Sequence, residues 1–128
     1  MLKKLNPPDV VKPFSNYAQG VEAVPNMRWL HVSGQVGVKP DGTCPADFAG
    51  QMEIALDNLL GVLKAAGMGP QDIVKVTTFM TDRNDLAASR AIREKKLEGV
   101  PVASTLIFVA GLARPEWKIE IECTAAKA

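Results

Sequence analysis

The chain has 128 residues, a formal net charge of +1 and 47% hydrophobic residues. This length suits one domain with a sizeable core, so we expect residues 1–128 to fold as a single domain. A nearly neutral charge balance gives no electrostatic reason to expect nucleic acid or a membrane as a partner. No run approaches the roughly 20 apolar residues of a membrane span, and no apolar segment follows the first lysines as in a signal peptide. The cytoplasm is therefore the expected compartment.

The first part of the chain predicts two paired strands. Residues 17–24 form a modest strand candidate, and a turn signal separates them from a stronger candidate at residues 27–38. The two strands are expected to form a hairpin. Gly34 and Gly37 in the second strand indicate a bulge or a close approach by another backbone or a ligand.

A helix is predicted after Asp47, which is a candidate N-cap. Apolar residues then recur with helical period. They are Phe48, Met52, Ala55, Leu56, Leu59, Val62, Leu63 and Ala66. Gly67 follows the last of these apolar residues, at the position where a glycine in the left-handed conformation commonly ends a helix. One face of this helix must be buried, and a sheet is the expected partner.

The remaining elements alternate between strand and helix. They are a strand at residues 73–80, a helix from Asn84 or Asp85 to about Glu98, and strands at residues 103–110 and 117–125. The order β-β-α-β-α-β-β predicts an α/β fold, a mixed sheet with both helices packed on one face. The opposite face of the sheet has no internal cover, which predicts oligomerisation.

The sequence carries no signature of metal or cofactor chemistry. Cys44, Cys123 and the only histidine, His31, fit no metal-ligand spacing. We therefore expect no metal, no cofactor and two free thiols, with Cys123 packed in the core and Cys44 exposed in a polar loop. A serine–histidine–aspartate triad would have to use His31, for which a structural role in an alternating strand is the favoured interpretation.

Three clusters could carry other chemistry. Glu120 and Glu122 share a face of a predicted strand, where one could be a general base; the alternative is a solvated polar face. Ser33 and Gly34 could contact a ligand, or they could form an ordinary bulge. The third cluster is in the second predicted helix, where a solvated face is the favoured interpretation. It consists of Arg90, Arg93, Lys95 and Lys96. The alternative is that one of its side chains projects into a cleft and binds a carboxylate.

From about residue 12 onward the chain resembles the RidA/YjgF family, formerly labelled L-PSP endoribonucleases. The order and spacing of the matching stretches carry this resemblance. They are residues 14–20 (FSNYAQG), 32–35 (VSGQ), 51–67, 72–75 (DIVK), 84–85 (ND), 101–105 (PVAST) and 119–122 (IEIE).

The resemblance implies a chorismate-mutase-like fold and a homotrimer with ligand clefts between subunits. It also implies cofactor-independent hydrolysis of reactive enamines and imines, such as 2-aminoacrylate, to ketoacids and ammonia. By the same resemblance the family tyrosine falls on Tyr17 and the serine-glycine pair on Ser33 and Gly34. The acid that activates water falls on Glu120.

One family position departs from the pattern. The family arginine that grips the substrate carboxylate would stand at Ala103, so the resemblance predicts weak or no deamination of ordinary 2-imino acids. A family asparagine falls on Arg90, which is our candidate to supply the missing charge. Backbone N–H groups near Ser104 and Thr105 complete the predicted ligand site.

Three functions are open at this point. The first is a deaminase or hydrolase of a reactive enamine or imine, in which Glu120 activates water and Tyr17 orients the substrate. The second is a non-catalytic trimer that binds a small metabolite in the same cleft. The third, a ribonuclease or translation inhibitor, is disfavoured by the neutral charge balance, the single histidine and the 5% aromatic content.

Overall fold

The computed structural model describes residues 2–128. The strands and helices follow the chain in this order: β1 (Lys3–Leu5), β2 (Gly20–Glu22), β3 (Arg28–Val36), α1 (Phe48–Ala65), β4 (Ile73–Met80), α2 (Leu86–Lys96), β5 (Ala103–Phe108) and β6 (Ile119–Lys127). Short 3-10 turns at Pro70–Asp72 and Arg83–Asp85 precede β4 and α2.

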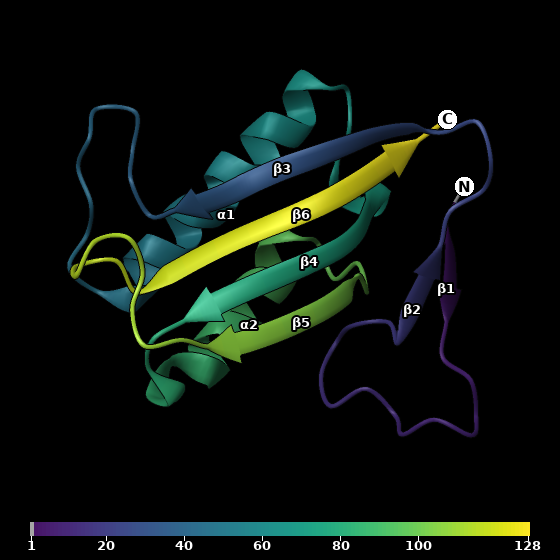
Figure 1. Ribbon diagram of the computed structural model, residues 1–128, viewed down its shortest axis with the longest axis horizontal. Helices are drawn as coiled ribbons and strands as arrows, with labels where there is room; N and C mark the ends of the chain where they lie inside the picture. The colour runs from purple at the N-terminus through teal and green to yellow at the C-terminus, as the bar shows by residue number, and fades with distance from the viewer. Residues whose placement is uncertain (1) are drawn as a thin grey trace.

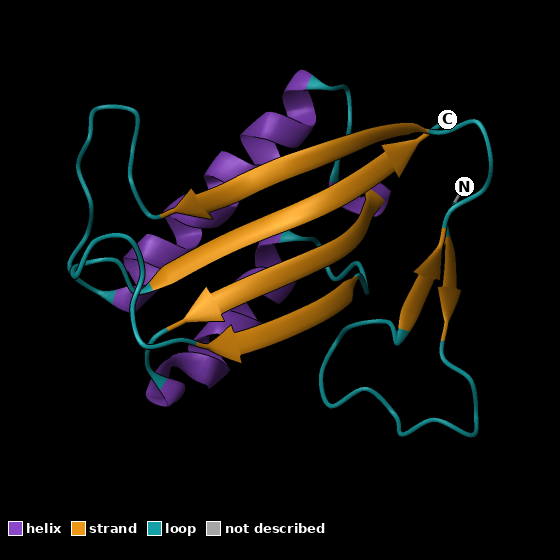
Figure 2. Ribbon diagram, in the orientation of Figure 1, coloured by secondary structure: helices purple, strands orange, loops and turns teal. Residues whose placement is uncertain are grey.

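The four longer strands form one mixed sheet in the order β3-β6-β4-β5 (Figure 1). β6 is antiparallel to both of its neighbours, whereas β5 is parallel to β4. Both helices pack on the same face of this sheet (Figure 2). The predicted α/β class, with one covered and one open sheet face, is confirmed. In residues 2–128 neither helix is long and apolar enough to cross a membrane.

α1 begins and ends as the sequence predicts. The Asp47 carboxylate accepts a hydrogen bond from the Gly50 backbone N–H at 3.0 Å, which caps the first turn. Gly67, just beyond the helix, has a φ of +70°, the left-handed conformation that glycine adopts without strain. The apolar face of α1 lies against β3 and β6.

The core forms between α1 and the helix-facing side of the sheet. In β6 the buried residues alternate with partly or fully exposed ones, so Ile119, Ile121 and Cys123 point toward the helices. Burial raises the pKa of the Cys123 thiol to about 12. Cys44 is half-buried rather than exposed, and both thiols are free, as predicted.

The predicted hairpin at the start of the chain is wrong. β3 pairs with the C-terminal β6, while β2 pairs with β1, a strand that the pattern did not reveal. The strand candidate at residues 17–24 shrinks to β2, because Ala18 leaves it to bridge Ala103 of β5. The hairpin does not form because β3 pairs instead with β6, a strand that is longer than β2, half-buried and distant in the sequence.

Gly37 marks a close approach between the sheet and α1. A Cβ atom on Gly37 would lie 2.5 Å from the Cα atom of Gln51, whereas a Cβ on Gly61 of α1 would meet no atom within 4 Å. The sequence predicted such an approach at Gly37, and the helix backbone is the group that approaches.

We expect Gly37→Ala to lower the free energy of unfolding by about 1–3 kcal/mol, because backbone rather than a flexible side chain must move. The matched variant Gly61→Ala should raise it by up to about 1 kcal/mol, since alanine favours a helix interior. Urea unfolding of both variants measures the difference. Equal stabilities would contradict the close approach.

Candidate functional site

A β-bulge in β3 lies against the side chain of Glu120. The register between β3 and β6 shifts between Val32 and Gln35, which places Ser33 and Gly34 in the bulge. A Cβ atom on Gly34 would overlap the Glu120 carboxylate, so glycine leaves the space that this side chain fills. The predicted bulge is therefore present, and it brings two of the predicted site residues into contact.

Glu120 and Glu122 share the open face of the sheet, as their spacing predicts. In the described part of the chain neither carboxylate has an ion-pair partner. Glu122 is exposed, as expected of a solvated polar residue, whereas Glu120 is half-buried above Gly34. Of the two, Glu120 is the better placed to act on a ligand held against the sheet.

Ala103 and Glu120 lie far apart within one chain. Phe79 of β4 pairs with Glu120 on one side and with Ile107 of β5 on the other. Ala103 precedes Ile107 by four positions along β5, and two strand spacings separate β5 from β6. The two positions are therefore about 16 Å apart, at about 3.3 Å per residue and 4.8 Å per strand. One small metabolite cannot contact both within a single chain.

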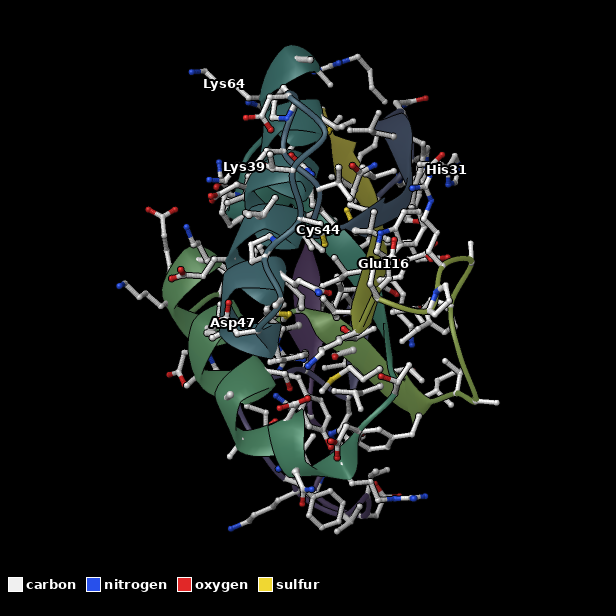
Figure 3. All side chains as sticks on the ribbon, turned by 90° about the vertical axis from the view of Figure 1, so that its left-hand side faces the viewer. His31, Lys39, Cys44, Asp47, Lys64 and Glu116 are labelled. Atoms are coloured by element: carbon white, nitrogen blue, oxygen red, sulfur yellow. The ribbon has the colours of Figure 1, made fainter. Side chains whose placement is uncertain are left out.

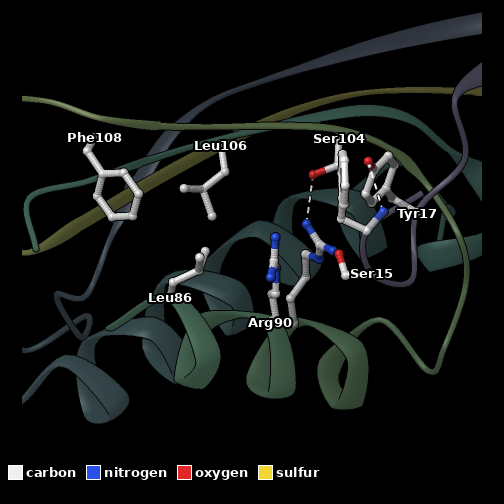
Figure 4. A pocket seen from close by; sticks show the side chains of 9 residues that line it. Ser15, Tyr17, Leu86, Arg90, Ser104, Leu106 and Phe108 are labelled. Atoms are coloured by element: carbon white, nitrogen blue, oxygen red, sulfur yellow. Dashed lines mark hydrogen bonds between the residues drawn. The ribbon is translucent and has the colours of Figure 1, made fainter. Parts of the chain in front are cut away.

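A pocket of about 260 Å³ opens between α2, β5 and the segment before β2. Arg90 points from α2 toward β5, where Ser104, Leu106 and Phe108 face it (Figure 4). The full lining is Phe14, Ser15, Tyr17, Leu86, Arg90, Arg93, Ser104, Leu106 and Phe108. Three predicted site residues thus meet here.

The predicted ligand residues fall into two groups. Tyr17, Arg90 and Ser104 line the pocket. Ser33, Gly34 and Glu120 lie at the bulge on the open face. Ala103 and Thr105, on either side of Ser104, belong to neither group. Thr105 is exposed, and its hydroxyl lies 2.6 Å from the Lys75 ammonium, which donates to it.

Arg93 is a pocket residue to which the sequence interpretation gives no individual role. The favoured interpretation of its cluster is a solvated helix face, but Arg93 is only 6% exposed. Its guanidinium donates to the Ser104 hydroxyl at 2.7 Å and to the Asn16 carbonyl at 3.4 Å. Desolvation by burial, and then the positive charge of Arg90, lower the pKa of Arg93. Its position seven residues after Leu86, on the face of α2 that meets β5, is the signal that could have revealed it.

His31 does not belong to a catalytic triad. It is exposed on the side of the sheet away from α1 (Figure 3). Its Nδ1 atom lies 3.4 Å from the Thr124 hydroxyl, and it forms no ion pair with any acid of residues 2–128. The structural interpretation of His31 is consistent with this placement.

Comparison with known proteins places this fold in a known family. The chain belongs to the endoribonuclease L-PSP family, whose model matches residues 8–127. This is the RidA/YjgF group that the sequence resembles, and its chorismate-mutase-like α/β fold is the fold of this chain.

Individual relatives match along nearly the whole chain. The 2-iminobutanoate/2-iminopropanoate deaminase of Escherichia coli strain K12 is 38% identical over 126 residues, 95% of this chain and 93% of that protein. The crystal structure of YyfB, a Yersinia pestis protein of the conserved Rid family with unknown function, has a TM-score of 0.88 and 32% identity over 98% of each chain. The crystal structure of E. coli TdcF with bound serine has a TM-score of 0.74 and 29% identity, covering 98% of this chain and 99% of that one.

We expect Gly34→Ala to displace the Glu120 carboxylate, because the new methyl group would occupy its position. The side chain is flexible, so the free energy of unfolding should fall by only about 1 kcal/mol. A crystal structure of the variant checks the displacement, with Gly61→Ala as a control that leaves the bulge intact. An unmoved Glu120 carboxylate would contradict the contact.

Proposed function

We propose that this chain hydrolyses a reactive imine or enamine metabolite, without a cofactor, in a cleft between the subunits of a homotrimer. The observation that carries the proposal is the half-buried Glu120 carboxylate above the Gly34 bulge. A carboxylate that faces an open surface without an ion-pair partner is available to accept a proton.

In the proposed reaction Glu120 removes a proton from water as the water oxygen attacks the carbon of the protonated imine. The resulting neutral carbinolamine carries one new C–O bond. Protonated Glu120 then returns the proton to nitrogen. The C–N bond breaks as the carbinolamine hydroxyl gives its proton to Glu120, and a carbonyl compound leaves together with ammonia, which carries this last proton away as ammonium. An enamine enters the same route after its β-carbon takes up a proton. One water is consumed for each ammonia released.

The separation of the two residue groups supports a shared cleft. Tyr17 and Ser104 lie at the β5 edge of the sheet, and Glu120 lies two strands away. A second copy that docks on the open face would bring its own Glu120 to the pocket edge of the first. Exposed apolar residues on that face, Trp29 at 52% and Ile107 at 43%, favour such docking.

The remaining predicted residues take positioning roles in this proposal. Tyr17 is half-buried at the pocket, and its hydroxyl accepts a hydrogen bond from the Phe14 backbone N–H at 3.2 Å. This contact fixes the phenol that would orient the substrate. β5 is an edge strand that Ala18 bridges at Ala103, so backbone N–H groups of β5 beyond this bridge point away from the sheet. Such donors stabilise negative charge that develops on the substrate.

Ala103 at the start of β5 favours a second candidate function, a non-catalytic trimer. Without a guanidinium at this position, the cleft would bind a small metabolite but not catalyse its hydrolysis. The nearly neutral chain gives no support to ribonuclease activity.

The proposed assembly predicts a mass near three times the 13.7 kDa of one chain in sedimentation equilibrium. Ile107→Glu should reduce this mass, because it places a charge on the open sheet face that another subunit covers. Val62→Glu is the matched control, since Val62 is a similarly exposed apolar residue of α1, on the helix side. A wild-type monomer at micromolar concentration would contradict the shared cleft.

The proposed base predicts that Glu120→Gln lowers the rate of ammonia release by about 10²–10⁴-fold. The assay supplies freshly generated 2-aminoacrylate or 2-aminomuconate and subtracts spontaneous hydrolysis. Glu122→Gln removes the same charge from the same strand face and should change the rate less than about twofold. Ammonia release by Glu120→Gln at the wild-type rate would exclude Glu120 as the base, and an inactive wild type would favour the non-catalytic alternative.

A further inference from the structure

Residues 14–17 form a turn that carries Tyr17 to the edge of the pocket. Within this turn the Tyr17 N–H donates to the Ser15 carbonyl at 3.0 Å, and the Phe14 N–H donates to the Tyr17 hydroxyl at 3.2 Å. Packing contributes little at the start of the turn, because Phe14 is 75% exposed. The orientation of the phenol therefore depends on the contacts that hold the turn from outside.

Asn16 makes the two hydrogen bonds that join residues 14–17 to the remainder of residues 2–128. Its side-chain amide donates to the Gly99 carbonyl at 2.9 Å, and its backbone carbonyl accepts from the Arg93 guanidinium at 3.4 Å. Arg93 lies in α2, and Gly99 follows closely after the helix. Asn16 thus attaches the turn to the end of α2.

The Gly99 carbonyl is a fixed acceptor because of the way α2 ends. The Gly99 N–H donates to the Glu94 carbonyl at 2.9 Å, and Gly99 has a φ of +72°, a conformation that glycine adopts without strain. On the other side of Tyr17, the Ala18 N–H donates to the Val102 carbonyl at 2.9 Å. Tyr17 therefore lies between two attached residues, and only the attachment through Asn16 requires a particular side chain.

The Tyr17 hydroxyl keeps its own proton available for a ligand. Its oxygen accepts from the Phe14 N–H, and a phenol has one O–H to donate in addition. Tyr17 lines the pocket beside Ser104 (Figure 4). A hydrogen bond from this O–H to a ligand is directional, so a displacement of the ring weakens it.

We propose that Asn16 is a positioning residue, whose amide directs the Tyr17 hydroxyl into the pocket by donating to the Gly99 carbonyl. The inference rests on the proposed function, because it states how the residue that orients the substrate is itself held. Asn16 acts through Tyr17 and has no contact with the substrate in this proposal.

Fluorine NMR of the full-length protein labelled with fluorotyrosine tests the proposal, because Tyr17 is the only tyrosine of the chain. Asn16→Ala should shift or broaden the tyrosine resonance, since the turn loses its attachment to Gly99. Asn16→Asp should do the same, because a carboxylate cannot donate to a carbonyl. Asn84→Ala is the matched control and should leave the resonance unchanged, since Asn84 is an exposed asparagine of the 3-10 turn before α2.

An unchanged tyrosine resonance in both Asn16 variants would overturn the proposal. Tryptophan fluorescence of the variants should match that of the wild type. Unfolding of the whole domain in both variants would also overturn the proposal, because a positioning residue acts locally.

A double-mutant cycle separates positioning of Tyr17 from any other role of Asn16. Asn16→Ala should lower kcat/KM for ammonia release by about tenfold, and by no more than Tyr17→Phe does. In the Tyr17→Phe background the same substitution should change kcat/KM less than about twofold, because no hydroxyl is left to direct. Equal effects of Asn16→Ala in the two backgrounds would show that Asn16 does not act through Tyr17.

The NMR measurement involves no turnover, so failure of this proposal is distinguishable from failure of the hydrolase proposal. A protein whose tyrosine resonance responds to both Asn16 variants but that releases no ammonia would refute only the hydrolysis. A protein that releases ammonia while its tyrosine resonance ignores both variants would refute only the positioning role.

Discussion

The insertion of β6 between β3 and β4 is the pairing on which the rest of the structure depends. The C-terminal strand gives each neighbour an antiparallel partner along most of its length. Its period of two then directs Ile119, Ile121 and Cys123 toward the helices and Glu120 and Glu122 toward the open face. The same strand thus completes the core and presents the proposed base.

Close packing around the start of β6 keeps this base in position. The fully buried Gln51 amide of α1 donates to the Pro45 and Glu116 carbonyls, at 2.8 and 3.0 Å, and accepts from the Lys118 N–H at 2.8 Å. A buried amide with its partners in place fixes the loop that leads into β6. Gly34, which leaves space for the Glu120 carboxylate, completes the local fit.

Two parts of a single chain lack the partners that would stabilise them. The open sheet face exposes large apolar residues, and the β5 edge holds a buried guanidinium without an opposite charge. Apolar surface is stabilised by a second protein surface, whereas a buried cation is stabilised by an anion. The proposed assembly would cover the apolar residues of the open face.

Patterns in the sequence predict the α/β class, the ends of α1, all eight residues of β4 and the shared face of Glu120 and Glu122, and they offer a bulge at Gly34 as one of two alternatives. These follow from local rules, namely the periods of helix and strand, caps and the space that glycine leaves. The folded chain is needed to see that β3 pairs with β6 rather than β2, and that Arg93 is buried beside Ser104 while Lys95 is exposed. The reason is that strand pairing and the burial of a long side chain depend on partners distant in sequence, whose positions no local pattern contains.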